Sequence, residues 1–279
     1  RSSSAASDVY KRQTLLGAAI GAGDLGIVML LVEKGADIDY VNHGGHGALD
    51  AAVYRGQDEI AAFLIGSGLA PSIHHHAALG DVEAISTLAR REPHLLGVTP
   101  AGGRWRMTPL HAAAIGVQAR AAEHLLELGV DVNAEDHNGH TALARVIEVD
   151  RGHPRFGGRL GVANLLVDAG ADVDCLGGHF GGEILHRAII HNDRELAHLL
   201  LESGADPNAV DGSGKSALHH AGARSVKMVE LVLGDGPDLE ITTIRRAKPG
   251  GGEIQSETAL AMAERLGKSA AIKLIEAIC

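Results

Sequence analysis

The sequence contains few aromatic residues and only two cysteines. Aromatic side chains make up 3% of its 279 residues, so a core of large rings is not expected, although 45% of the residues are hydrophobic. Interfaces built from Ala, Leu, Val and Gly are expected instead. The cysteines, Cys175 and Cys279, are far apart, so they indicate neither a disulfide framework nor zinc spacing. The localisation is unknown, with a reducing, cytoplasmic compartment favoured.

The sequence also lacks an excess of positive charge and a long apolar run. With 25 basic and 35 acidic residues its formal net charge is -10, which disfavours nucleic acid or an anionic membrane surface as a partner. No stretch approaches the roughly 20 apolar residues that a membrane-spanning helix needs. We therefore expect a protein partner, no nucleic acid, no membrane span and a monomeric chain.

Residues 1–13, RSSSAASDVYKRQ, show neither an initiator Met nor a hydrophobic pattern. We interpret them as a non-native, adapter-like tail and leave them out of the fold prediction. The N-terminus is accordingly expected to be incomplete.

The rest of the sequence repeats with a period of 33 residues. TPLHAAAIGV at Thr108 is followed by TALARVIEVD at Thr141, and EILHRAIIHN at Glu183 by SALHHAGARS at Ser216, each 33 residues on. Each start precedes a second apolar segment and a Gly-Ala-Asp motif or a variant of it. A fixed period of this kind indicates a repeat architecture. We count eight units, which begin near residues 14, 47, 71, 108, 141, 183, 216 and 258.

Each unit predicts two helices and a projecting turn. Thr108 is a helix-capping residue, and Pro109 occupies the first helical position, where its missing N–H costs nothing. Gly129 ends the second helix, because glycine adopts the left-handed conformation readily. The Asn138–Gly139 pair indicates a tight turn. The predicted fold is an all-α solenoid of helix-turn-helix units with short β-hairpin or loop fingers.

These features resemble the ankyrin repeat family. The T-P-L-H-x-A pattern stands at Thr108–Ala113, Gly-Ala-Asp endings recur behind it, and the resemblance covers residues 14–279. It implies that finger tips and the exposed ends of the first helices contact partners. It also implies a structural role, hydrogen bonding to backbone between adjacent fingers, for four histidines: His74, His111, His186 and His219.

Insertions interrupt the period in three places. They are EPHLLGVTPAGGRWRM after the third unit, VDRGHPRFGGRLG within the fifth and TTIRRAKPGGGEIQSE after the seventh. We expect these insertions to lie on the surface. The last unit carries Glu264, Arg265, Lys268 and Lys273, as a terminal capping repeat facing water requires.

Residues 209–216, AVDGSGKS, are close to the phosphate-binding loop of nucleotide hydrolases. Such a loop follows a buried parallel strand, whereas a helix end and Pro207 precede this stretch. Aligned with the other repeats, Gly214 turns the finger and Ser216 caps the next helix. We predict no nucleotide site and no cofactor.

Seventeen histidines, among them HHH at 74–76, suggest metal binding as a second possibility. Zinc would need three converging ligands, and no H-E-x-x-H motif occurs. No G-x-S-x-G motif occurs either, and no cysteine stands beside an evident base. We therefore predict no metal site and no enzymatic activity, with metal-dependent hydrolysis as the less favoured hypothesis.

We predict that the protein is an interaction scaffold that binds a protein partner through a concave surface of fingers and first-helix ends. The alternative is the recognition arm of a larger enzyme, channel or secreted effector. Trp105, the only tryptophan, is of a type enriched at binding hot spots; it either contacts the partner or packs back into the core. The candidate contact residues are His43, His46, Tyr54, Arg55, Arg104, Trp105, Met107, His137, Asn138, His140, Glu148, His179, Phe180, His191, Lys215 and Arg224.

Overall fold

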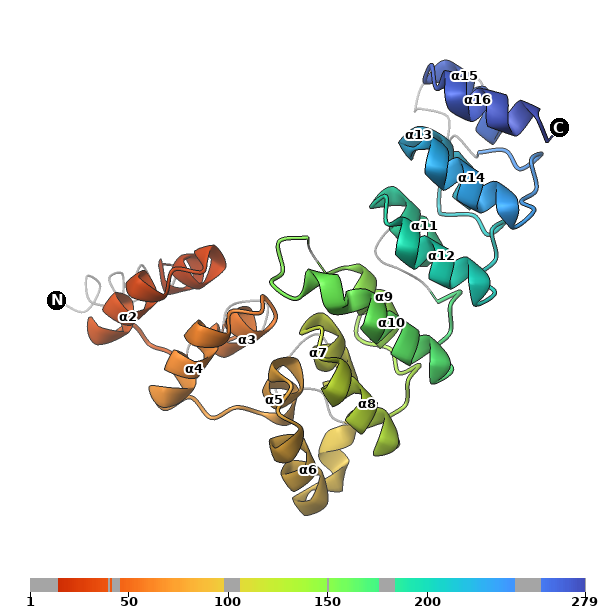
Figure 1. Ribbon diagram of the computed structural model, residues 1–279. Helices are drawn as coiled ribbons and strands as arrows, with labels where there is room; N and C mark the ends of the chain where they lie inside the picture. Colours follow the sequence, from red (N-terminus) through yellow and green to blue (C-terminus); the bar gives the residue numbers. More distant parts are fainter. Residues whose placement is uncertain are drawn as a thin grey trace, which may run out of the picture. The chain divides into compact units, whose positions relative to one another are not determined.

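The computed structural model describes residues 15–39, 41, 46–97, 106–149, 151–175, 184–243 and 257–278. Within these ranges the chain is helical, without strands and with two isolated antiparallel bridges, Val41–Gly47 and Thr242–Thr258. The helices follow one another in pairs, as the period predicts (Figure 1). The proposed tail at 1–13 lies outside the described residues.

The first helix covers residues 15–22. The α-helices that follow are α2 (Leu25–Glu33), α3 (Ala48–Val53), α4 (Asp58–Gly66), α5 (Ile73–Leu79), α6 (Val82–Arg91), α7 (Pro109–Ile115), α8 (Ala119–Glu127), α9 (Ala142–Ile147), α10 (Arg159–Asp168), α11 (Ile184–Ile190), α12 (Arg194–Glu202), α13 (Ala217–Arg224), α14 (Val226–Gly234), α15 (Ala259–Arg265) and α16 (Ser269–Glu276). Two short 3₁₀ helices, η1 (Pro93–Leu96) and η2 (Phe156–Gly158), lie in insertions.

Contacts divide the chain into two compact bodies. The N-terminal body contains residues 1–137 and 148–169, and the C-terminal body contains 138–147 and 170–279. In the N-terminal body α3 packs against α5 and α5 against α7, while α2, α4, α6, α8 and α10 are second helices. We call the first helix of each pair the inner helix and the second the outer helix.

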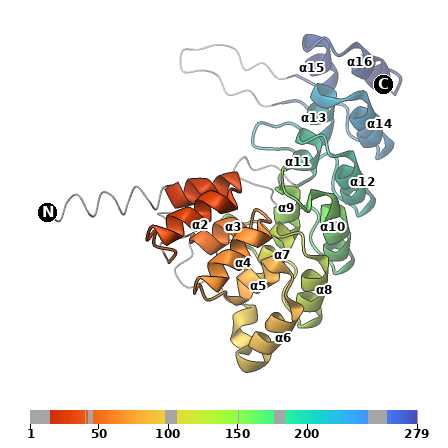
Figure 2. The ribbon, with the colours of Figure 1, turned by 60° about the vertical axis from the view of Figure 1, so that its left-hand side comes forward.

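The C-terminal body has the same order. Its inner helices α9, α11, α13 and α15 pack one against the next, and the outer helices α12, α14 and α16 do the same (Figure 2). Neighbouring repeats thus bury each other's apolar faces, as expected of a solenoid.

Small residues let the inner helices approach closely. Ala112, Ala113 and Ala114 of α7 are fully buried. A Cβ atom at Gly116 would lie 2.3 Å from the carbonyl oxygen of Ala78, so only glycine fits where α7 ends against α5. The scarcity of aromatic residues is consistent with these narrow contacts.

Several local predictions are confirmed. Gly129 follows α8 in the left-handed conformation, with a φ angle of 81°. Thr108 caps α7, with Pro109 at the first helical position. In the last repeat Glu264, Arg265 and Lys268 are exposed.

The insertion within the fifth repeat lies largely on the surface, as expected, with Gly152 and Pro154 exposed. Within it, however, His153 is only 8% exposed. Its neighbour Arg155 forms an ion pair with Asp58, which stands 97 positions earlier in the sequence. The insertion is therefore packed against earlier repeats of the N-terminal body.

The buried apolar contacts predict a large effect of truncation in a middle repeat. Leu110 is fully buried in α7, so Leu110→Ala should lower the free energy of unfolding by about 2–5 kcal/mol. Leu128, 37% exposed after α8, provides the matched control; Leu128→Ala should cost about 0.5 kcal/mol or less. Urea denaturation followed by circular dichroism measures both, and equal losses would contradict the packing described.

Candidate functional site

A histidine three residues after the capping residue fixes the start of several inner helices. The backbone N–H groups of Ser72, Thr108 and Ser216 donate to the Nδ1 atoms of His75, His111 and His219, at 2.9, 3.1 and 3.3 Å respectively. Because Nδ1 accepts these bonds, the proton of each neutral ring is on Nε2.

The Nε2 atoms then connect one repeat to the next. His219 Nε2 donates to the carbonyl oxygen of Glu257 at 3.2 Å, and His74 Nε2 donates to that of Met107 at 2.8 Å. In both cases the acceptor directly precedes the capping threonine of the following repeat. His186 Nε2 donates to the carbonyl of Ala209 at 3.0 Å. These bonds give the predicted histidines a structural role.

The third repeat divides this role between two residues. Pro71 stands where several other repeats have Thr or Ser, so the cap shifts by one residue to Ser72 and His75 makes the capping bond. His74 keeps the bond to the next repeat. The Nε2 atom of His75 donates instead to Asp50 at 2.9 Å, and Asp50 itself caps α3 by accepting from Gly47 N–H at 2.7 Å. Burial acts to raise the pKa of Asp50, but the bonds from His75 and Gly47 outweigh burial and lower it.

The three consecutive histidines do not converge on a common point. His74 bonds Met107, His75 bonds Asp50, and His76 Nδ1 lies 3.1 Å from a carboxylate oxygen of Asp81. Among the described residues, no three His, Cys, Asp or Glu side chains are arranged to hold a metal ion.

The loop that resembles a phosphate-binding loop is already filled by a carboxylate. Asp211 Oδ1 accepts from Ser213 N–H at 2.8 Å and from Lys215 N–H at 3.0 Å, and Asp211 Oδ2 accepts from His220 Nε2 at 2.9 Å. The amides that would hold a phosphate are therefore bound within the chain. Burial acts against the charged form of Asp211, yet these bonds hold its pKa well below the usual range.

Cys175 is a poor candidate for a nucleophile. Its thiol is half-buried and lies 3.2 Å from Thr141 Oγ1. Burial raises the pKa of this thiol to about 11, so the reactive thiolate is scarce at neutral pH.

The candidate contact residues fall into three groups. Arg55, His137, His191 and Arg224 are exposed, and His46, Tyr54, Asn138, Glu148 and Lys215 are half-buried. Met107 and His140 are buried, with 4% and 2% of their surfaces exposed. His43, Arg104, Trp105, His179 and Phe180 lie outside the described residues.

The structure brings some of these residues together. Tyr54 and Arg55 directly follow α3 in the N-terminal body. In the C-terminal body His191 and Arg224 end successive inner helices, and the adjoining turns are joined by a 3.0 Å bond from Ser225 Oγ to Asn192 Oδ1. Lys215 lies apart from these, on the finger before α13.

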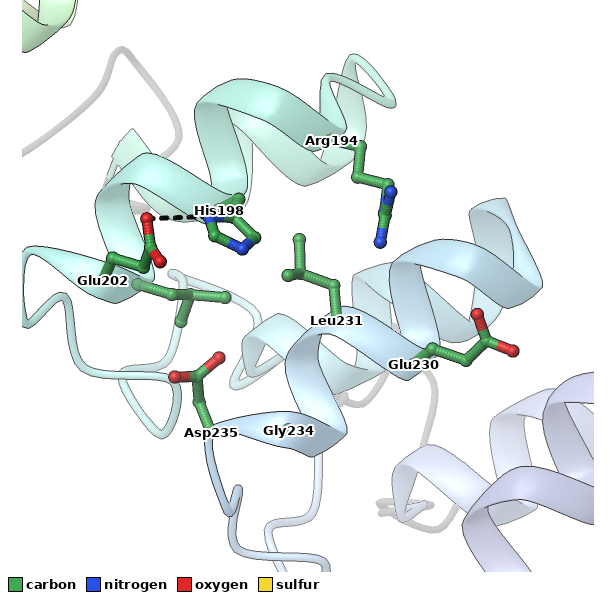
Figure 3. A pocket seen from close by; sticks show the side chains of 8 residues that line it. Arg194, His198, Glu202, Glu230, Leu231, Gly234 and Asp235 are labelled. Atoms are coloured by element: carbon green, nitrogen blue, oxygen red, sulfur yellow. Dashed lines mark ion pairs between the residues drawn. The ribbon is translucent and has the colours of Figure 1, made fainter.

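The sequence interpretation missed a groove on the outer face of the C-terminal body. It lies between α12 and α14, has a volume of about 380 Å³ and has Leu201 and Leu231 within it (Figure 3). Glu202 and Asp235 lie on the same side of the groove, where His198 is ion-paired to Glu202 at 2.9 Å, and Arg194 lies toward the other side. Arg194, His198 and Glu202 recur every four residues, a spacing that places them on one helix face and could have indicated this groove.

Comparison with known proteins now identifies the class. Models of ankyrin repeats match residues 155–243 (three copies), 16–65 (many copies) and 105–137 (one repeat). Together these matches cover more than half of the chain. The chain belongs to the ankyrin repeat family, whose members are generally protein–protein interaction modules.

The curated relatives are much longer than this chain. It is 33% identical to Neurogenic locus notch homolog protein 1 of Danio rerio over 144 residues, which are 51% of this chain and 6% of the relative. It is 22% identical to an L-asparaginase of Dirofilaria immitis over 228 residues, 78% of this chain and 30% of that protein. The chain thus spans less than a third of the length of these relatives.

Solved structures show the same fold. An ankyrin repeat domain from Acinetobacter baumannii AYE matches with a TM-score of 0.58 and 24% identity, over 74% of this chain and 96% of that one. A chain in the complex of the Bd0816 predatory endopeptidase of Bdellovibrio bacteriovorus with the immunity protein Bd3460 matches with a TM-score of 0.57, at 24% identity, over 74% and 97%. None of the helices in the described ranges has the length and apolar character to cross a membrane.

The buried histidines predict that acid destabilises the fold. Burial lowers the pKa values of His186 and His219, and lowers that of His220 to about 4. Because the folded values lie below the unfolded value of 6.5, the stability they contribute is complete above pH 6.5 and is lost as the pH falls toward the folded values.

The free energy of unfolding by urea should therefore be lower at about pH 5 than at about pH 7.5, and the urea concentration at the midpoint should fall with it. His220→Gln should reduce this difference, whereas His198→Gln, which removes an exposed histidine, should not reduce it. A His220→Gln protein with the full pH dependence would contradict the assignment.

Proposed function

We propose that the chain is a non-catalytic binding module that recognises a protein partner through its fingers and the ends of its inner helices. The observation that supports this proposal is that different residues of each repeat serve the fold and face solvent. The capping residue and histidine of the pattern are bonded inside the array, whereas Arg55, His137 and Arg224 are exposed. Residues that the fold does not use are available for recognition.

The proposed contact surface consists of the exposed and half-buried candidates described above. Met107 and His140 are left out because they are covered in the structure. His43, Arg104, Trp105, His179 and Phe180 stay in the proposal on the strength of their positions in fingers and insertions. Surface complementarity, rather than bond chemistry, is the mechanism.

The charges of the inner-helix ends favour an acidic partner. The protein has a net charge of -10, yet exposed arginines stand at inner-helix ends in each body, Arg55 just after α3 and Arg224 at the end of α13. Complementary charge across an interface speeds association and selects partners. A partner that presents Asp or Glu to either arginine fits these helix ends.

A second candidate function is recognition on behalf of a larger protein. The curated relatives are at least three times as long as the matched region, and include proteins named for enzymatic activities, such as the L-asparaginase and a palmitoyltransferase of Homo sapiens. The sequence of the complete gene tests this: a catalytic domain beside the repeats supports the second candidate, and its absence supports a separate adaptor or inhibitor.

Affinity capture from a lysate of the source organism, followed by mass spectrometry, identifies the partner. With that partner, Trp105→Ala should weaken binding by about 2 kcal/mol or more, because tryptophans at hot spots contribute on this scale. Trp105→Phe is the matched control and should lose less. Unchanged affinity of a folded Trp105→Ala protein would remove Trp105 from the contact surface.

The arginines and histidines of the surface give a second prediction. Arg224→Ala should slow association and reduce its dependence on salt, since exposed charges act mainly on association rates.

Binding should also vary between about pH 5.5 and 7.5, the range in which histidines usually titrate. Surface plasmon resonance measures both, and a flat pH profile would contradict participation of His137 and His191.

A further inference from the structure

The insertion in the fifth repeat, residues 151–158, breaks a rule of solenoid proteins. Each repeat normally contacts only its neighbours. Arg155, however, donates through Nη1 to the carbonyl of Gly116 in the fourth repeat at 3.2 Å, and through Nη2 to the carboxylate of Asp58 in the second repeat. One side chain thus joins two repeats that are not adjacent to each other.

The row of turns between inner and outer helices explains why the insertion binds there. In two repeats a glutamine covers a left-handed glycine of the preceding repeat. A Cβ at Gly23 would lie 3.3 Å from Gln57 Nε2, and one at Gly80 would lie 2.5 Å from Gln118 Oε1. These close approaches repeat along one edge of the N-terminal body.

The glycine of the second repeat lacks this cover from its neighbour. The third repeat has Asp81 at the position of the glutamine, and Asp81 instead caps α6 and contacts His76. The insertion takes its place: a Cβ at Gly56 would lie 2.9 Å from His153 Nε2 and 3.1 Å from Pro154 Cδ. Residues 151–158 therefore occupy a gap left by a shorter side chain two repeats away.

We propose that residues 151–158 form a pH-sensitive clasp, which at neutral pH holds the inter-helix turns of the second and fourth repeats and on acidification releases them. The segment precedes α10 and reaches toward the end of α3 (Figure 1). When the clasp is closed it covers Gly56, directly beside the candidate contact residues Tyr54 and Arg55. Release uncovers this edge of the array.

The environment of His153 makes the clasp sensitive to protons. Its Nδ1 accepts the backbone N–H of Arg155 at 3.1 Å, so the neutral ring has its proton on Nε2. Among the described residues that buried Nε2 has no hydrogen-bond partner. A second proton on Nδ1 would remove the acceptor for Arg155 N–H and place an unbonded charge in the contact.

The groups around His153 also disfavour its protonated form. Burial, followed by the positive charge of Arg155, lowers the pKa of His153, and Asp58 on α4 partly offsets both effects. The α7 end contributes Gly116 and Val117, which carry no charge, and Arg55 before Gly56 is exposed. Since His153 is neutral when the clasp is closed and titrates normally when it is open, falling pH favours the open state.

Hydrogen exchange of the full chain, measured by mass spectrometry and corrected for intrinsic rates, tests the clasp without any partner. In the wild type, peptides covering 54–60 and 115–120 should exchange slowly at about pH 7.5 and several-fold faster at about pH 5. The turn at 66–70 of the same body, at the opposite end of α4 from Asp58, is the internal control.

Two variants separate the clasp from general acid destabilisation. Arg155→Ala should raise exchange of both peptides about tenfold at neutral pH, because it removes two polar contacts at once. His153→Asn keeps an acceptor near the position of Nδ1 but does not titrate, so its protection should no longer depend on pH. The proposal is overturned if Arg155→Ala exchanges like the wild type, or if His153→Asn keeps the full pH dependence.

Discussion

The structure depends on the close approach of successive inner helices. Gly116 lies so near the backbone of Ala78 that no side chain fits between them. Fully buried alanines continue this contact along α7. Each repeat buries its apolar face against its neighbours, so it depends on them, and stability is a sum of repeat and interface contributions.

Hydrogen bonds from histidines fix how each repeat is positioned against the next. A ring that accepts the capping N–H through Nδ1 must donate through Nε2, and the donated bond of His219 ends on the backbone just before the next repeat. One side chain therefore caps a helix and sets the position of its neighbour. The same chemistry explains why a protein rich in histidine holds no described metal cluster: the rings of the three consecutive histidines have separate partners.

Much of the fold could be predicted because its determinants are local. Thr108, Pro109 and Gly129 specify the ends of helices by capping and backbone conformation, and the period specifies how repeats succeed one another. The clasp could not be predicted, because it joins Arg155 to Asp58 across 97 positions and depends on Asp81 being shorter than glutamine. The burial of Met107 and His140 also depends on neighbouring repeats, which a pattern within one repeat does not describe.

The buried residues of the repeats have a structural role, and the fingers and inner-helix ends are the proposed contact surface. The outer groove between α12 and α14 is the alternative contact surface. Lysines distinguish them within the C-terminal body, since Lys215 lies on a finger, Lys227 on α14 and Lys273 on α16. Cross-linking mass spectrometry of the complex with the captured partner is the most direct test. The account predicts cross-links from the partner to Lys215, and cross-links confined to Lys227 and Lys273 would contradict it.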